Sequence, residues 1–249
     1  MLYPTVVEVA RSGVARRVLP RPAEERVALV TGSAGGLGRA ITRRLAHDGL
    51  AVAVNDVGDP APVLEVVGAI RRDGGVAEAF MGDVTDEREA ADLAAAVTGR
   101  LGPVEVLVLN AAGPQPEAPV ALVAWEDHVA QLELFVKSPV VLGRALLPGM
   151  AAKRSGRIVQ VDCEVVDRPP PGRTAYATAK GAQIGLTRSW ARELAPLGIT
   201  VNTVAPGFVP GVRHTREDIA HAVSFIASEA ASSITGQRIV VDGGRGLAA

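Results

Sequence analysis

Short apolar runs alternate with longer amphipathic stretches along this chain. The runs are rich in β-branched residues and cover 27–30, 51–54, 104–109, 158–161, 199–204 and 239–241. Most are apolar at successive positions, as expected for strands buried on both faces of a parallel sheet. Helix-like stretches lie between them, among them 38–47, 87–97 and 175–194. This order predicts one doubly wound α/β domain of the Rossmann type over residues 26–249, with helices on both faces of a parallel sheet. Residues 1–25 are predicted to form an arm.

Composition narrows the classes of function. The length of 249 residues suits one large α/β domain, and a net charge of −1 favours neither nucleic acid nor an anionic membrane surface. Cys163 is the only cysteine, and charged residues interrupt the N-terminal apolar stretch, which argues against a signal peptide. We therefore predict a cytoplasmic protein with no nucleic-acid or membrane partner, and we predict no metal site.

A glycine-rich loop follows the first predicted strand and opens the first helix. It spans Thr31–Gly38 and contains Gly32, Gly36 and Gly38. Glycines permit a tight turn and let the backbone approach a pyrophosphate, and the helix N-terminus offers free N–H groups. An ordinary glycine-rich turn is the alternative. The position between a buried strand and a helix favours a dinucleotide site.

The residue that ends the second predicted strand indicates which dinucleotide is bound. Asp56 lies 18 residues after Gly38, where a carboxylate can accept hydrogen bonds from the adenosine ribose and repel a 2′-phosphate. No Arg or Lys lies inside the glycine loop. We therefore predict NAD and regard NADP as the weaker alternative. Asp56 could instead serve only as a turn residue in the segment 56–60.

Tyr176 and Lys180 are the candidate proton-transfer pair. They lie one turn apart on a predicted helix, so they share a face. A nearby ammonium favours phenolate and lowers the pKa of a phenol, which would let it exchange a proton with an alcohol or carbonyl oxygen. A pair at this spacing also arises by chance, so this pair carries weight only together with other motifs.

The motifs together resemble the short-chain dehydrogenase/reductase family in order and spacing, over about residues 25–245. The resemblance rests on the glycine loop, 110–113, Tyr176 with Lys180, 202–207, 234–236 and 242–244. It implies a seven-stranded sheet of order 3-2-1-4-5-6-7 and a homodimer or homotetramer.

The resemblance also assigns residues to roles. Tyr176 would be the acid/base, and Lys180 would hold the nicotinamide ribose and lower the pKa of the tyrosine. The remaining cofactor-binding assignments fall into four groups along the chain. The dinucleotide loop contributes Gly32, Ser33, Gly36, Leu37 and Gly38, and the adenine pair is Asp83 and Val84. The segment 110–113 contributes Asn110, Ala111 and Gly113, and the residues beside the nicotinamide are Pro206, Gly207 and Val209.

Two departures from the family pattern concern catalysis. Cys163 stands 13 residues before Tyr176, where the family has a catalytic serine. A thiol is a weaker donor than a hydroxyl, and losing such a donor costs on the order of 10²–10³ in rate. Cys163 could still donate weakly, it could act differently as a thiolate, or it could simply be a small buried residue. Phe135 falls where the family has a catalytic asparagine, and its side chain cannot join a proton relay.

A third departure concerns the substrate site. The segment 208–216 is shorter than the helical lid of the family, which implies an open site and a bulky or carrier-bound substrate. The arm 1–25 is a candidate cover, and His214 is expected to be an exposed loop residue.

Two hypotheses remain at this point. The first is an NAD(H)-dependent oxidoreductase of the ketoreductase or alcohol dehydrogenase type, with Tyr176 moving the proton and Cys163 taking part of the serine's role. The second is a catalytically impaired relative that serves as a nucleotide-binding structural or partner subunit, as Cys163, Phe135 and the short segment suggest. The intact glycine loop, Tyr176 and Lys180 favour the first.

Overall fold

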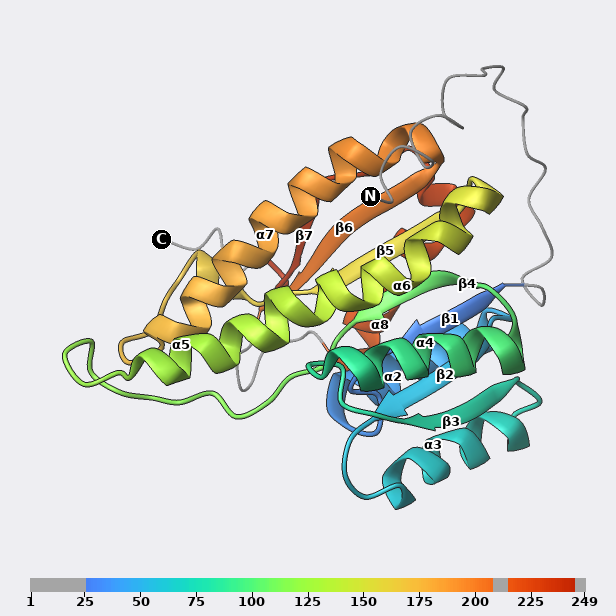
Figure 1. The fold of residues 1–249 in the computed structure, drawn as a ribbon, viewed down its shortest axis with the longest axis horizontal. Helices are drawn as coiled ribbons and strands as arrows, with labels where there is room; N and C mark the ends of the chain where they lie inside the picture. Colours follow the sequence, from blue (N-terminus) through green and yellow to red (C-terminus); the bar gives the residue numbers. More distant parts are fainter. Residues whose placement is uncertain (1–25, 208–214, 245–249) are drawn as a thin grey trace.

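A seven-stranded, all-parallel sheet forms the centre of the computed structural model, which describes residues 26–207 and 215–244 (Figure 1). The strand order is β3-β2-β1-β4-β5-β6-β7. The strands are β1 (Val27–Val30), β2 (Ala51–Asp56), β3 (Ala77–Met81), β4 (Val104–Leu109), β5 (Gly156–Val161), β6 (Ile199–Pro206) and β7 (Arg238–Val241). The predicted Rossmann-type fold and its strand order are confirmed.

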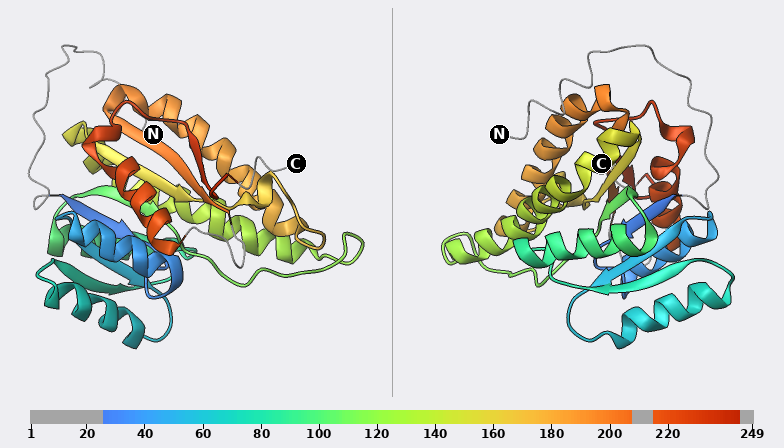
Figure 2. Two further views of the ribbon diagram at one scale, coloured as in Figure 1. Left: turned by 180° about the vertical axis from the view of Figure 1, so that it is seen from behind. Right: turned by 45° about the vertical axis from the view of Figure 1, so that its right-hand side comes forward.

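Helices cover both faces of the sheet. One face carries α2 (Gly36–His47), α3 (Ala61–Arg72) and α8 (Arg216–Ala227). The other carries α4 (Glu87–Leu101), α5 (Trp125–Leu132), a π-helical turn η3 (Glu133–Lys137), α6 (Ser138–Lys153) and α7 (Thr174–Leu194). Short 3-10 turns lie at η4 (Glu164–Val166), η5 (Ala195–Leu197) and η6 (Glu229–Ala231). Figure 2 shows the two helical layers from behind and in an oblique view.

The sheet separates two apolar cores because successive side chains of a strand point to opposite faces. In β1, Ala28 and Val30 join the core beneath α2 and α8, whereas Val27 and Leu29 join the core beneath α4 and α6. All four residues are buried, which explains why this strand is a continuous apolar run.

Strand β3 is the one strand that the hydrophobic pattern does not pick out. Its sequence, Ala77–Met81, holds no β-branched residue and includes Glu78. Among the described residues it is an edge strand that pairs only with β2, from Val52 against Ala77 to Asp56 against Met81. An edge strand is buried less completely than a central one, so its composition is less apolar.

The segment Trp125–Lys153 is long and apolar enough to cross a membrane by length and composition alone. It is divided into α5, η3 and α6, and it packs against α4, α7 and β4. Leu142 and Met150 are fully buried in the core beneath it. The apolar composition of this segment is therefore explained by its packing on the sheet.

The predicted motifs lie together at one edge of the sheet, at the carboxyl ends of the parallel strands. Gly32 follows β1, Asp56 ends β2, Ala111 follows β4, Cys163 follows β5 and Gly207 follows β6. Ligands of open α/β sheets bind at this edge.

Candidate active site

The glycine loop is packed tightly against the end of β4. A Cβ at Gly38 would lie 2.1 Å from the Gly32 carbonyl oxygen and 2.6 Å from Asn110 Nδ2. Gly32 has a φ of +61°, and a Cβ there would lie 2.6 Å from Ala111 Cα. Asn110 Nδ2 donates to the carbonyl oxygens of Thr31 and Gly32, at 3.0 and 2.8 Å. The side chain of Asn110 therefore holds the loop in place.

The N-terminus of α2 is left uncovered by the described residues. Its N-cap is Gly35, no described side chain caps it, and its first turn holds no acidic residue. No described atom lies within 4 Å of a Cβ placed on Gly36, whose φ is +53°. By contrast, Asp86 caps α4 and Thr215 caps α8. The free N–H groups at the start of α2 can hold an anion, so this loop fits a pyrophosphate.

The side chains of Ser33 and Leu37 anchor the glycine loop to the protein interior. Ser33 is fully buried and its hydroxyl donates to the Asn55 carbonyl oxygen at 2.9 Å. Its side chain therefore contacts the protein interior. Leu37 is half-buried and packs on the core beneath α2. Both side chains therefore support the loop from the protein interior.

Asp56 is held firmly at the end of β2. Its Oδ2 accepts a hydrogen bond from Ala34 N at 2.8 Å, and its Oδ1 accepts one from Val57 N at 2.9 Å. A carboxylate has about four acceptor positions, so two remain for ribose hydroxyls. Asp56 lines a cavity, and its predicted contact with an adenosine ribose stays a prediction.

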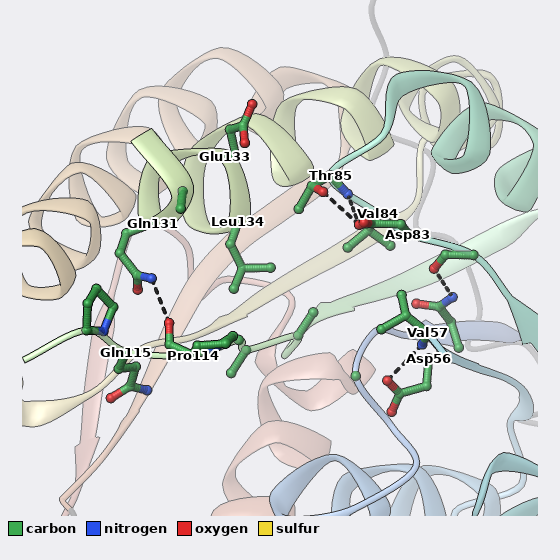
Figure 3. Close-up of a pocket in the computed structure, with 18 of the residues that line it drawn as sticks. Asp56, Val57, Asp83, Val84, Thr85, Pro114, Gln115, Gln131, Glu133 and Leu134 are labelled. Atoms are coloured by element: carbon green, nitrogen blue, oxygen red, sulfur yellow. Dashed lines mark hydrogen bonds between the residues drawn. The ribbon is translucent and has the colours of Figure 1, made fainter. Parts of the chain in front are cut away.

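That cavity measures about 550 Å³ and lies at the ends of β1 to β4, beneath α5 and η3 (Figure 3). Asp56 and Val57 lie at one end of it with Asp83 and Val84, the predicted adenine pair, and Gln115 and Gln131 lie at the other end. Other lining residues come from the segment after β4 and from α5 and η3: Ala111, Gly113, Pro114, Pro116, Asp127, Glu133 and Leu134. The sequence-predicted Gly32, Asp56, Asp83, Val84, Ala111 and Gly113 are thus brought together around one cavity.

The candidate proton-transfer residues form a separate cluster beside it. Tyr176 and Lys180 lie on α7 and are buried, at 8% and 3% exposure. Cys163 follows β5 and its thiol hydrogen-bonds to Tyr176. Phe135 packs on the Tyr176 ring edge to face, with the ring centroids 5.5 Å apart. The described lining of the cavity does not include these residues.

The expected lowering of the Tyr176 pKa is wrong for this structure. Burial raises the pKa of the phenol above its ordinary range, and the neighbouring Cys163 and Asp162 raise it further. Arg173 opposes these effects only in part. Desolvation disfavours the phenolate more than nearby cations favour it, so Tyr176 is held as the neutral phenol.

Lys180 is the most deeply buried cation of the cluster. Burial lowers its pKa to about 8, although Asp162 and Cys163 act in the opposite direction. Its ammonium donates to the Val161 carbonyl oxygen at 2.7 Å and to Gln183 Oε1 at 3.2 Å. Sequence reasoning missed Gln183, whose position one helical turn after Lys180 was the available signal.

Sequence reasoning also missed a buried ion pair that supports Cys163. Arg238 Nε donates to Asp162 Oδ2 at 2.6 Å, and Arg238 Nη2 donates to the Cys163 carbonyl oxygen at 2.9 Å. Arg238 also donates to Asp167 at 2.7 Å. Asp162 and Arg238 are 76 residues apart, so no local sequence pattern links them.

The predicted nicotinamide segment is described only in part. Gly207 packs so closely on the residue after β7 that a Cβ would lie 2.3 Å from Asp242 Cβ, which explains the glycine after Pro206. Val209, His214 and the rest of 208–214 lie outside the described residues, as does the arm 1–25. The expectations about the lid, the cover and Val209 therefore stay predictions.

The sequence matches the family model of short chain dehydrogenases over residues 26–221. Among similar proteins is cis-4-hydroxycyclohexanecarboxylate dehydrogenase of Sinomonas cyclohexanicum, which is 36% identical over 88% of this chain and 96% of that protein. Another is the 3-oxoacyl-acyl-carrier-protein reductase of Staphylococcus aureus, which is 35% identical over 87% of this chain and 96% of the reductase.

Solved structures agree with this assignment. A short-chain dehydrogenase/reductase of Burkholderia xenovorans superposes with a TM-score of 0.85 at 30% identity, covering 92% of this chain and all of that one. Gluconate 5-dehydrogenase of Burkholderia cenocepacia, in complex with NADP and tartrate, superposes with a TM-score of 0.83 at 26% identity, covering 90% and 96%. With the fold, the glycine loop and the sequence match in agreement, this chain belongs to the short-chain dehydrogenase/reductase family of oxidoreductases.

Proposed function

We propose that this protein is an NAD(H)-dependent oxidoreductase that interconverts a carbonyl and a hydroxyl group. The observation that carries the proposal is that Tyr176, in contact with Cys163, lies at the same edge of the sheet as the cavity that holds Asp56. A dinucleotide bound there would supply or take up the hydride, and the chain would supply the proton.

The preference for NAD rests on the charges at the adenosine end of the cavity. The Asp56 carboxylate would accept from the ribose hydroxyls and repel a 2′-phosphate. The nearby guanidinium of Arg39 is engaged by Glu65 in two hydrogen bonds of 3.0 and 3.1 Å, which reduces its availability for a phosphate. These two features together favour NAD over NADP.

Proton transfer is assigned to Tyr176. Because burial keeps its phenol protonated, the free protein carries the proton that a carbonyl oxygen needs when it is reduced. Cys163 would take part of the role of the family serine by orienting the Tyr176 hydroxyl and donating weakly to the substrate oxygen. The charge of Lys180 would stabilise the negative charge that develops on Tyr176 as the proton leaves.

The proposed substrate class rests on the length of the segment after β6 and on the relatives. Residues 207–215 connect β6 to α8, a connection shorter than the helical lid of the family, as expected for a bulky or carrier-bound substrate. Among the relatives are a reductase of 3-oxoacyl-acyl-carrier protein and a dehydrogenase of a substituted cyclohexanecarboxylate. We therefore propose a ketone or secondary alcohol on a ring or on an acyl chain.

Coenzyme titration followed by a substrate screen tests this function. The purified protein is titrated with NADH and with NADPH, and nicotinamide absorbance is then followed with 3-oxoacyl thioesters, cyclic ketones and the matching alcohols. We expect tighter binding of NADH and turnover that Tyr176→Phe removes. Tight NADH binding without turnover on the whole panel would favour the alternative, a nucleotide-binding structural or partner subunit. Absence of binding to either coenzyme would refute both.

We also propose that the protein is a cytoplasmic homodimer or homotetramer. Val120, Leu122 and Trp125 expose apolar side chains before and at the start of α5, at 78%, 74% and 68%. Exposed apolar patches of this kind mark protein contacts. Light scattering on the purified protein measures the oligomeric state, and a monomer at micromolar concentration would refute the proposal.

A further inference from the structure

The ammonium of Lys180 has an aromatic neighbour that the family pattern does not supply. Its Nζ lies 3.8 Å from the centroid of the Phe135 ring. The other close partners are the Val161 carbonyl oxygen at 2.7 Å and Gln183 Oε1 at 3.2 Å. Two oxygens and one ring thus match the three N–H donors of the ammonium.

The same ring contacts the candidate acid/base. The centroids of the Phe135 and Tyr176 rings are 5.5 Å apart and their planes are inclined by 69°. Lys180 Nζ lies farther from the Tyr176 ring, at 5.8 Å from its centroid. Phe135 is 3% exposed and belongs to a small apolar cluster with Val165 and Tyr176. Lys180 and Tyr176, the two side chains of the proposed proton transfer, therefore both contact the buried ring of Phe135.

We propose that Phe135 is a positioning residue for Lys180 and Tyr176: its ring face holds the charged ammonium, and its edge-to-face contact fixes the phenol. The role of Phe135 in proton transfer rests on the proposed function, whereas its contact with the Lys180 ammonium does not. The negative face of an aromatic ring attracts a cation, and the attraction is stronger where water is excluded. An asparagine or an aliphatic side chain at position 135 has no such face.

Neighbouring titratable groups also affect the pKa of Lys180, so a test of the Phe135 contact has to leave those groups unchanged. Asp162 and Cys163 face it from the end of β5, and Tyr176 faces it from its own helix. None of these groups changes when fluorine replaces ring hydrogens of Phe135. Fluorine withdraws electron density from the ring face and nearly preserves its shape, so fluorination changes the attraction for the cation and little else.

The experiment replaces Phe135 by 3,4,5-trifluorophenylalanine and follows the lysine side chains by NMR. The chain has only three lysines, Lys137, Lys153 and Lys180, so ¹³Cε-labelled lysine gives three signals that can be titrated separately. The Lys180 signal is expected to titrate near pH 8 in the unmodified protein. We expect the fluorinated ring to lower that midpoint by about one pH unit, because the charged amine loses its attraction to the ring.

Matched controls separate this effect from general disturbance. Phe225 is half-exposed on α8, so the same fluorinated residue there should leave the Lys180 midpoint unchanged. The NMR signals of Lys137 and Lys153 should be the same in every variant. Phe135→Leu should lower the Lys180 midpoint in the same direction, and thermal melting confirms that each variant is folded.

An unchanged Lys180 midpoint in folded trifluorophenylalanine protein would overturn the inference, even if the enzyme turned over normally. Failure of NADH to bind would instead overturn the proposed function and leave the lysine titration as a valid test of the contact. A lowered midpoint together with unaltered signals from Lys137 and Lys153 supports the inference.

Discussion

Arg238 and Asp162 form a buried ion pair that joins β7 to the chain leaving β5. The guanidinium Nε lies 2.6 Å from Asp162 Oδ2, and a second nitrogen donates to the Cys163 carbonyl oxygen at 2.9 Å. Asp162 is 4% exposed. Because Cys163 is the next residue in the chain, this pair sets where the thiol lies relative to Tyr176.

Removing the arginine should destabilise the fold strongly. In Arg238→Met the buried Asp162 carboxylate loses the cation that hydrogen-bonds to it, and such losses cost about 3–5 kcal/mol of unfolding free energy. Urea denaturation measures the change. Arg88→Met is the control, because Arg88 pairs with Asp92 on the surface and its side chain is 92% exposed, so it should change stability by less than about 0.5 kcal/mol. Equal effects of the two substitutions would contradict the assigned role.

Replacing the thiol by a hydroxyl should improve catalysis. Cys163→Ser restores a stronger donor beside Tyr176, and we expect kcat/KM for carbonyl reduction to rise by roughly 10- to 100-fold, within the effect of a single donor to a developing oxyanion. Cys163→Ala should lower it. Steady-state kinetics at saturating NADH measure both. A serine variant slower than the natural protein would show that the thiol has a role of its own.

Removing the phenolic hydroxyl should abolish most turnover. Tyr176→Phe keeps the ring that packs on Phe135 but loses the proton, so kcat should fall by about 10²–10⁴-fold. NADH affinity, measured by fluorescence titration, should change by less than about threefold, because the hydroxyl is assigned to the substrate. An undiminished kcat would disprove the assignment of the acid/base.

The rate of carbonyl reduction should fall in mildly alkaline solution. The pKa of Lys180 is lowered to about 8, so its positive charge is present below that pH and is lost above it. Tyr176 stays protonated over the same range because burial raises its pKa. The pH profile of kcat/KM, which reports the free enzyme, should therefore be level below about pH 7 and decline above about pH 8.

The variant Lys180→Met tests the origin of that decline. It should have a low and pH-independent kcat/KM, since no ammonium remains to be titrated. A natural protein whose profile stays level to about pH 9.5 would show that the charge of Lys180 does not limit the reaction.

Coenzyme choice should depend on the Asp56 carboxylate. Asp56→Asn preserves the shape and an acceptor for the Ala34 N–H, but it removes the charge that attracts ribose hydroxyls and repels a 2′-phosphate. We expect the ratio of NADPH to NADH affinity to rise by about 10- to 100-fold, in line with 1.5–3 kcal/mol for a hydrogen bond to a charged group. Asp59→Asn is the control, since Asp59 is exposed in the next turn and accepts a local hydrogen bond from Ala61 N.

Much of the fold was predictable because hydrophobic patterns within short segments of the chain indicate its strands and helices. Strands such as 104–109 are apolar at almost every position, since helices bury both of their faces. The loop was recognisable from its glycines. These positions are glycine because a side chain at Gly32 or Gly38 would clash with the neighbouring backbone. Strand β3 required the family resemblance, because an edge strand is buried less and Glu78 interrupts its apolar character.

The amino-acid sequence by itself determined the parallel sheet, the glycine loop, Asp56 at the end of its strand, and the spacing of Tyr176 and Lys180. These features depend on residues close together in the chain. Tertiary structure alone decided that burial outweighs nearby cations in setting the pKa of Tyr176, that Phe135 carries the Lys180 ammonium, and that Arg238 holds Asp162. Each of these is set by desolvation or by contact between distant segments, and the free energy of a charge depends on what surrounds it in space.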